Sequence, residues 1–191
     1  MISRAEIRYA LRGLIDILRF NPGFLQFYDR SLAGARRSFQ IYVFLLALQT
    51  LQTIVFQGPQ DPPLTARMWT ALTIARIINV VYFPLILLLI GRFIDREKRI
   101  VGCIAVYNWL NLLSILLSIP VTLIALAGVD ASVLQLCSIV TLFVGLICEG
   151  YVLAICLGIS PAFAAAFVAL DLVIGEILFH LADAMGQHAF F

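Results

Sequence analysis

Three ionisable residues, Asp171, Glu176 and His180, fall inside an apolar stretch at 161–183. About 23 residues composed mostly of Ala, Leu, Ile, Val and Phe are enough for a helix that crosses a bilayer. Ionisable groups at such depth are costly unless they face protein or water, and they often mark proton or ion paths. The stretch therefore predicts a central helix in a bundle, with neighbouring helices arranged to satisfy these side chains.

A second acid, Glu149, ends a stripe of polar and small residues that recur at helical spacing. The stripe consists of Gln135, Ser138, Thr141, Gly145 and Glu149. Asp171 is near the predicted midplane, and Asn108 and Asn111 are close enough in depth to hydrogen-bond either acid. In a structural interpretation of this buried polar network, the asparagines hold the acids. In a functional interpretation, the acids form a proton or cation site within a transporter.

The structural interpretation is favoured, because the chain is small and shows neither an inverted repeat nor a clearly broken helix pair. Arg76 and Glu176 are predicted to form an ion pair. At about 1.5 Å of rise per residue, each lies roughly 10 Å below the same membrane surface. The alternative is that Arg76 reaches outward alone to the headgroups. His180, one turn beyond Glu176, either joins the pair or lies in headgroup water.

The composition excludes a soluble protein. Of the 191 residues, 62% are hydrophobic and 13% are charged, whereas soluble domains contain about 45–50% and about 25%. Five stretches are predicted to span the membrane, at 38–57, 69–91, 100–127, 132–157 and 161–183. Gly158 should end the fourth span, and Ser160-Pro161 should begin the fifth. The fold class is therefore all-α: one polytopic membrane helix bundle at 38–183, followed by a short tail at 184–191.

Residues 1–37 form a basic segment that is too polar to span a membrane. In its predicted helix at 2–20, four apolar residues share a narrow stripe: Ile7, Leu11, Leu14 and Leu18. Arg8, Arg12 and Arg19 lie beside this stripe. The pattern is typical of an amphipathic helix in the membrane interface, with its arginines at anionic lipid headgroups. The alternative is a helix that packs under the bundle.

Lys and Arg are distributed unevenly over the predicted loops. The N-terminal segment holds seven arginines and the run at 92–99 holds four basic residues, whereas the loop after the first span holds only Arg67. Basic residues gather on the cytoplasmic side. We therefore expect a bacterial inner-membrane protein with a cytoplasmic N-terminus and its C-terminus outside. The run at 92–99 is interpreted as a solvated turn without a binding role.

Motifs of soluble enzymes and of metal or nucleic-acid sites are missing from the sequence. It contains no phosphate-binding glycine loop, no HExxH and no Gly-x-Ser-x-Gly. Its cysteines lack CxxC spacing and are interpreted as small core residues: Cys103, Cys137, Cys148 and Cys156. The arginines adjoin the bilayer, which argues against nucleic-acid binding. We therefore predict a protein that is not an enzyme, without a metal or cofactor.

The layout of a basic N-terminal segment followed by five closely spaced spans resembles the Ypt-interacting-protein (Yip) domain family, which has bacterial members. The third-span sequence Ala105-Val106-Tyr107-Asn108-Trp109 is similar to an aromatic–polar element that bacterial relatives often show there. The resemblance covers most of the five spans in topology. The Asp-Leu-Tyr-Gly-Pro motif of eukaryotic members is missing, so binding of small GTPases is not carried over. The resemblance implies a membrane-organising or adaptor protein rather than an enzyme.

The sequence thus predicts a non-catalytic membrane scaffold or assembly partner, in which Asp171, Glu149, Asn108 and Asn111 fix the helix register. Its partners would be anionic lipids, and another membrane protein or a second copy of the chain. The alternative is a small proton- or cation-coupled transporter or channel that uses Asp171 and Glu149 as a relay. The variant Asp171→Asn separates the two, because it abolishes flux in a transporter and alters stability or partner recovery in a scaffold.

Overall fold

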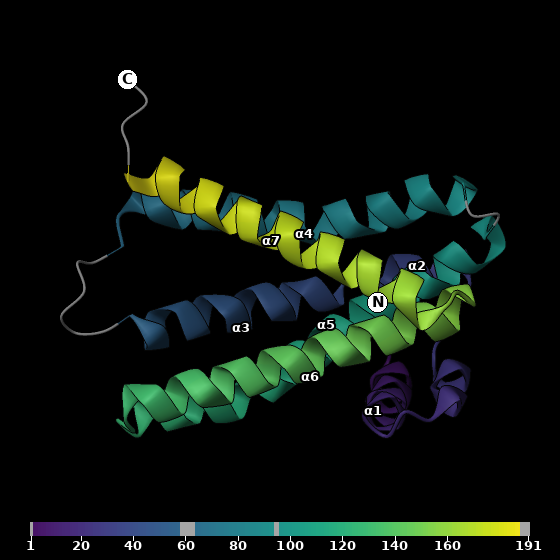
Figure 1. Cartoon of the computed structure of the whole chain (residues 1–191), viewed down its shortest axis with the longest axis horizontal. Helices are drawn as coiled ribbons and strands as arrows, with labels where there is room; N and C mark the ends of the chain where they lie inside the picture. The colour runs from purple at the N-terminus through teal and green to yellow at the C-terminus, as the bar shows by residue number, and fades with distance from the viewer. Residues whose placement is uncertain (1, 58–63, 94–95, 188–191) are drawn as a thin grey trace.

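The computed structural model describes residues 2–57, 64–93 and 96–187, and over these residues the chain is helical without strands. The elements in chain order are α1 (Arg4–Leu18), η1 (Pro22–Phe27), α2 (Leu32–Ser38), α3 (Ile41–Phe56), α4 (Ala66–Phe93), α5 (Glu97–Leu126), α6 (Ala131–Leu157) and α7 (Pro161–Gln187) (Figure 1). Five stretches are long and apolar enough to cross a membrane. The prediction of an all-helical chain with five helices that could span a membrane is confirmed over the described residues.

The first span differs most from its predicted limits. It runs over Leu32–Phe56 and combines α2 with α3, so it begins six residues earlier than expected and includes Arg36 and Arg37. The other four spans follow the predicted stretches closely. The loop expected after the first span and the last residues of the tail lie largely outside the described residues.

Turn chemistry at Gly158–Pro161 separates α6 from α7 as the sequence predicts. Gly158 caps α6 at a φ of 64°, a left-handed conformation that glycine adopts without steric cost. The hydroxyl oxygen of Ser160 accepts a hydrogen bond from the backbone N–H of Phe163 at 3.3 Å, and Pro161 is the first helical residue. This short connection places the ends of α6 and α7 next to each other.

The long helices are arranged in two pairs. Helix α4 runs along α7, α5 runs along α6, and α2 and α3 pack against α5. Figure 1 shows the two pairs converging near α1 and α2 and diverging toward the end of α7, with α3 between them. We call α1, η1 and α2 the platform, the nearby end of the bundle the platform end, and the opposite end the distal end. The divergence creates room between the pairs in the distal half.

Buried side chains concentrate in the half of the bundle next to the platform. In α5 every residue from Gly102 to Leu110 is buried, whereas burial is sparse toward the helix end. In α6 the buried residues begin at Cys148, and in α3 they end at Leu45. Outward-facing apolar side chains suit contact with lipid, for example Phe44, Leu51, Leu89, Leu136, Phe143 and Phe179. The bundle is therefore closed at the platform end and loosely packed at the distal end.

Helix α1 packs under the bundle through a face that its apolar stripe does not predict. The buried residues of α1 are Ala10, Gly13, Leu14 and Ile17, and they lie toward η1, α5 and α6. Of the predicted stripe, only Leu14 is buried. A Cβ added at Gly13 would lie 2.6 Å from the ring of Tyr28, whose hydroxyl donates to the backbone oxygen of Ala10 at 3.2 Å. Small residues, which permit this close approach, determine the buried face.

Polar contacts join the parts of the platform. The side chain of Arg37 in α2 bridges Glu6 of α1, at 3.3 Å, and Asp29, at 2.6 Å. Hydrogen bonds from Ser31 and Arg37 hold the pKa of Asp29 below its usual value. Gly34 lies so close to Asp29 that an added Cβ would overlap the backbone oxygen of that residue. The platform is thus fixed by contacts between its own elements as well as by α5 and α6.

Candidate functional site

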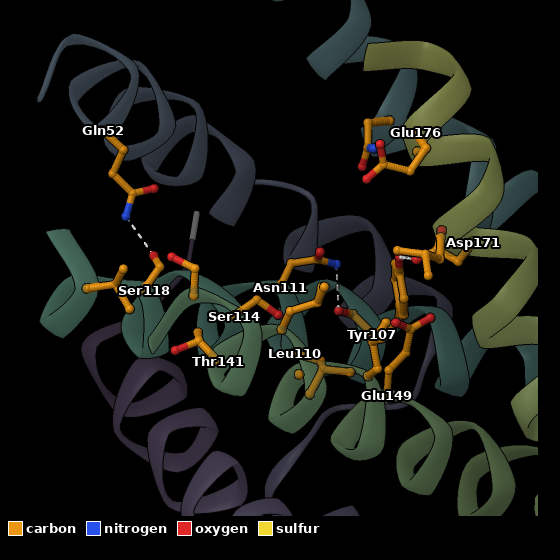
Figure 2. Close-up of a pocket in the computed structure, with 18 of the residues that line it drawn as sticks. Gln52, Tyr107, Leu110, Asn111, Ser114, Ser118, Thr141, Glu149, Asp171 and Glu176 are labelled. Atoms are coloured by element: carbon orange, nitrogen blue, oxygen red, sulfur yellow. Dashed lines mark hydrogen bonds between the residues drawn. The ribbon is translucent and has the colours of Figure 1, made fainter. Parts of the chain in front are cut away.

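A cavity of about 470 Å³, lined by polar and apolar side chains, lies between the diverging helix pairs. Its polar lining comes from α3, α4, α5, α6 and α7, and Figure 2 shows these side chains facing one another across it. The predicted stripe on α6 lines the cavity through Ser138, Thr141, Gly145 and Glu149. A second space of about 910 Å³ lies between α3, α4 and α7 and shares Gln52, Phe56, Asn79 and Gly175 with the first. The two spaces therefore adjoin each other in the distal half.

Asp171 lies at the floor of the cavity, where two tyrosines hold its carboxylate. The hydroxyl of Tyr82 on α4 donates to Oδ1 and, at 2.9 Å, to the backbone oxygen of Asp171. The hydroxyl of Tyr107 on α5 donates to Oδ2 at 3.1 Å. The ring of Tyr107 stacks on Phe83 with 4.4 Å between centroids. Asp171 is therefore fixed by three helices at the point where the closed half of the bundle meets the cavity.

Glu149 is the second acid at the floor, and one of its oxygens has no partner. Only 9% of this residue is exposed, and its Oε1 atom makes no hydrogen bond. Glu149 and Asp171 line the same cavity, and the charge of each carboxyl group acts on the other. Two neighbouring carboxyl groups cannot both ionise easily, so such a pair readily shares one proton. The structure thus brings together the two acids that the sequence singled out.

The asparagines of the predicted network lie next to the acids but do not bond them. Asn108 is fully buried, accepts from the hydroxyl of Tyr42 at 3.1 Å and donates to Ser38 at 2.9 Å. Asn111 donates to Tyr42 at 3.1 Å and to the backbone oxygen of Tyr107 at 3.0 Å. The asparagines therefore tie α5 to α2 and α3 and close the bundle below the cavity. Of the two acids, Asp171 accepts its hydrogen bonds from Tyr82 and Tyr107.

Arg76 and Glu176 lie in different surroundings instead of in the predicted ion pair. The guanidinium of Arg76 donates to the hydroxyl oxygens of Thr50, at 3.1 Å, and Thr53, and to a backbone oxygen of the same helix. Glu176 lies beside His180, with 3.9 Å between Oε2 and Nε2. A planar guanidinium can use several oxygen acceptors at once, and α3 presents three of them. Arg76 therefore ties α4 to α3.

The remaining predicted residues are placed as follows. Arg8, Arg12 and Arg19 are exposed on α1. All four cysteines are free, and Cys103 adjoins Cys156 between α5 and α6. Within the described ranges, no group of three or more His, Cys, Asp and Glu side chains could hold a metal ion.

The sequence analysis did not predict that Tyr42, Tyr82 and Tyr107 belong to this region. For two of them, helical spacing does indicate a polar face. Tyr107 precedes Asn111 by four residues, so it shares the polar side of α5. Tyr82 follows Asn79 by three residues, and both line the cavity. Residues three and four apart lie on one helix face. Tyr42 of α3 had no such neighbour in the predicted network.

Comparisons with family models, with curated proteins and with solved structures find no match for this chain. The resemblance to the Ypt-interacting-protein family therefore stays a prediction. The function has to be argued from the carboxyl pair, the cavity around it and the membrane in which the bundle lies.

Proposed function

We propose that this protein binds protons or small cations in the distal cavity and moves them across the membrane, with Glu149 and Asp171 as the exchanging carboxyl pair. One observation carries the proposal: a glutamate that is nine-tenths buried leaves an oxygen unpartnered beside a second acid and a cavity. Intramembrane acids are costly and are typical of ion and proton paths. The geometry favours this function over the scaffold that the sequence favoured.

The two acids have different parts in the proposed exchange. Asp171 accepts hydrogen bonds from Tyr82 and Tyr107, so its side chain stays in position as ions bind and leave. Glu149 has a free oxygen and is the group that accepts an incoming cation or proton. When a cation arrives, the shared proton leaves, which couples the two movements. The proposed exchange involves no covalent chemistry.

The proposed orientation places the platform end at the cytoplasmic face of a bacterial inner membrane and the distal end at its outer face. It is supported by the eleven basic residues of the N-terminal segment and the 92–99 run, against one in the loop after the first span. In this orientation the cavity lies in the outer half of the bundle, and the buried core of the platform half separates it from the cytoplasm.

Proteoliposomes provide the test. A potassium gradient with valinomycin sets the membrane potential, an entrapped dye reports internal pH, and sodium or potassium gradients are applied in parallel. Wild-type protein is expected to move protons faster than protein-free liposomes. Asp171→Asn and Glu149→Gln are expected to fall to the protein-free rate while eluting as folded protein. Glu97→Gln, which alters an exposed acid at the platform end, serves as the matched control and keeps the wild-type rate.

Two results would contradict the proposal. Either the wild type does not exceed protein-free liposomes under any of these gradients, or Asp171→Asn and Glu149→Gln both keep the wild-type rate. If Asp171→Asn instead changes the recovery of a bound membrane protein, or of a second copy, without any flux in either form, the scaffold is the better account.

We also propose that α1 docks on anionic lipid. Its apolar residues Ile7, Leu11, Ile15 and Leu18 stay exposed although the neighbouring face is packed. Arg8, Arg12 and Arg19 border this exposed edge. At 100° per residue the apolar edge lies between the buried face and the arginines, an arrangement suited to a helix at the membrane surface.

Nanodiscs of different charge test the lipid contact. Wild-type protein is expected to unfold at a higher temperature in phosphatidylglycerol than in phosphatidylcholine, because each arginine near an anionic surface contributes about 1 kcal/mol. The difference should shrink at high salt and in the triple variant Arg8→Gln, Arg12→Gln, Arg19→Gln. An unchanged difference in the triple variant would rule out these arginines as the lipid contact.

A further inference from the structure

We infer that the cavity takes a small organic ammonium ion, whose N–H groups donate to Glu149 while its carbon skeleton lies against the tyrosines. This inference rests on the proposed function, because it names the class of cation for the same carboxyl pair. Three features support it: the charge of the lining, the lack of a hydrogen-bond donor to Glu149, and the size of the cavity.

The lining of the cavity carries negative charge without positive charge. Glu149, Asp171 and Glu176 line it, and no Lys, Arg or His belongs to its lining among the described residues. Arg76 lines the adjoining space and donates to the oxygens of α3. The carboxyl groups of the cavity itself repel an anionic ligand, whereas a cation is attracted by the negative charge that the pair retains after sharing one proton.

The unpartnered Oε1 atom of Glu149 determines which groups a bound cation must provide. Asp171 already accepts hydrogen bonds from Tyr82 and Tyr107. The Oε1 atom of Glu149 accepts none, and an acceptor buried to this extent is costly without a donor. A primary ammonium group brings both the charge and the N–H donors, and hydrogen bonds between charged groups are the stronger kind. A quaternary ammonium ion would bring the charge alone.

The size and walls of the cavity favour an organic cation over a metal ion. About 470 Å³ is within the range of sites for small organic ligands, which extends from about 300 to 1,000 Å³. Tyr82 and Tyr107 stand beside the acids, and Leu110, Leu142 and Leu146 complete the apolar part of the lining. Aromatic faces attract ammonium groups. A bare metal ion would leave most of this space unfilled.

Binding of the ammonium ion should release the proton that the carboxyl pair shares. Before binding, the pair carries one proton and one negative charge. Afterwards it carries two negative charges and contacts one positive charge, so the net charge of the site is unchanged. The released proton appears in the buffer. Titrations in buffers with different ionisation enthalpies therefore should report about one proton per bound ligand.

The test uses the full-length protein in detergent and 2-phenylethylammonium as the probe, followed by titration calorimetry. We expect saturable binding with proton release. The neutral isostere 2-phenylethanol should not bind, and the N,N,N-trimethyl derivative should bind more weakly than the primary ammonium. Glu149→Gln should weaken binding of the probe about 30-fold or more, because a buried charge loses its partner. Glu97→Gln should bind as the wild type does.

A second variant, Gly145→Leu, keeps both acids and changes only the volume of the cavity. A Cβ at Gly145 would meet nothing closer than the Ser114 hydroxyl at 4.0 Å, so the backbone accepts a side chain there. Gly145→Leu fills the cavity and should abolish binding, whereas Gly145→Ala should reduce it little. Equal binding of the ammonium and the alcohol, or unchanged binding in Glu149→Gln, would overturn the inference.

The outcomes separate this inference from the function on which it rests. Proton movement in liposomes without binding of the probe would overturn the ligand class and leave the transport proposal standing. Binding of the probe that depends on Glu149, without movement of any ion, would support the ligand class and overturn transport in favour of a binding protein.

Discussion

Replacing Asn108 with alanine is expected to lower the free energy of unfolding by about 2–4 kcal/mol, because it removes a buried side chain and leaves a buried hydroxyl without an acceptor. Asn108 is fully buried and joins Tyr42 to Ser38, so one side chain connects α5 with both α2 and α3. Ser38 keeps its bond to the backbone oxygen of Ala35. The lost stability should therefore come mainly from the hydroxyl group of Tyr42, which no longer has its acceptor.

A double-mutant cycle isolates this contact. Asn108→Ala, Tyr42→Phe and the double variant are unfolded in a detergent titration, and a coupling of about 1 kcal/mol is expected, within the range found for hydrogen bonds in membrane proteins. Ser138→Ala is a suitable control, because its hydroxyl donates only to a backbone oxygen of its own helix. Additive effects of Asn108→Ala and Tyr42→Phe would mean that the contact does not stabilise the bundle.

Replacing Gly34 with alanine is expected to loosen the platform and to cost about 1–3 kcal/mol, as overpacking does. The new Cβ would overlap a backbone oxygen of Asp29, and backbone cannot yield as a flexible side chain can. A shift of α2 away from Asp29 would also strain the contacts of Arg37 with Asp29 and Glu6. One methyl group thus acts on several contacts of the platform.

Thermal unfolding and limited trypsin digestion measure the effect of Gly34→Ala. The variant should melt at a lower temperature and be cleaved faster at Arg8 and Arg12. Gly150→Ala is the matched control, because its Cβ would make an ordinary contact of 3.6 Å with Val168 and alanine favours the helix by up to about 1 kcal/mol. Equal stability and digestion of the two variants would show that α2 has room at Gly34.

The membrane architecture could be predicted because it depends on properties that a sequence carries directly. Length and hydropathy identify the spans, and residue types at Gly158, Ser160 and Pro161 identify the turn between the last two. Helical periodicity also placed Ser138 and Thr141 on the side of α6 that lines the cavity. The two acids were found because charge in an apolar stretch is conspicuous.

The partners inside the bundle could not be predicted in the same way. Counting residues from a helix end gives a depth, but it gives neither the rotation of a helix nor its distance from the others. Arg76 and Glu176 have similar depth, yet Arg76 turns to α3. Tyr82 and Tyr107 could equally well have been apolar wall residues, since their hydroxyl groups matter only once an acceptor is placed within reach. Contacts between helices therefore required the structure.

The proposed transport requires a second arrangement of the helices, open at the platform end and closed at the distal end. The uneven packing of the bundle affects how these two arrangements are populated. Opening the platform end would separate the stacked rings of Phe83 and Tyr107 and expose the buried run from Gly102 to Leu110. For the proposed transport we therefore expect the arrangement in Figure 1 to be the resting state and its counterpart to be sparsely populated. A ligand that reverses a 1:99 ratio of the two arrangements must bind the minor arrangement about 5.5 kcal/mol more tightly. A ligand that binds both arrangements equally would occupy the cavity without changing their ratio, and so would not be carried across the membrane.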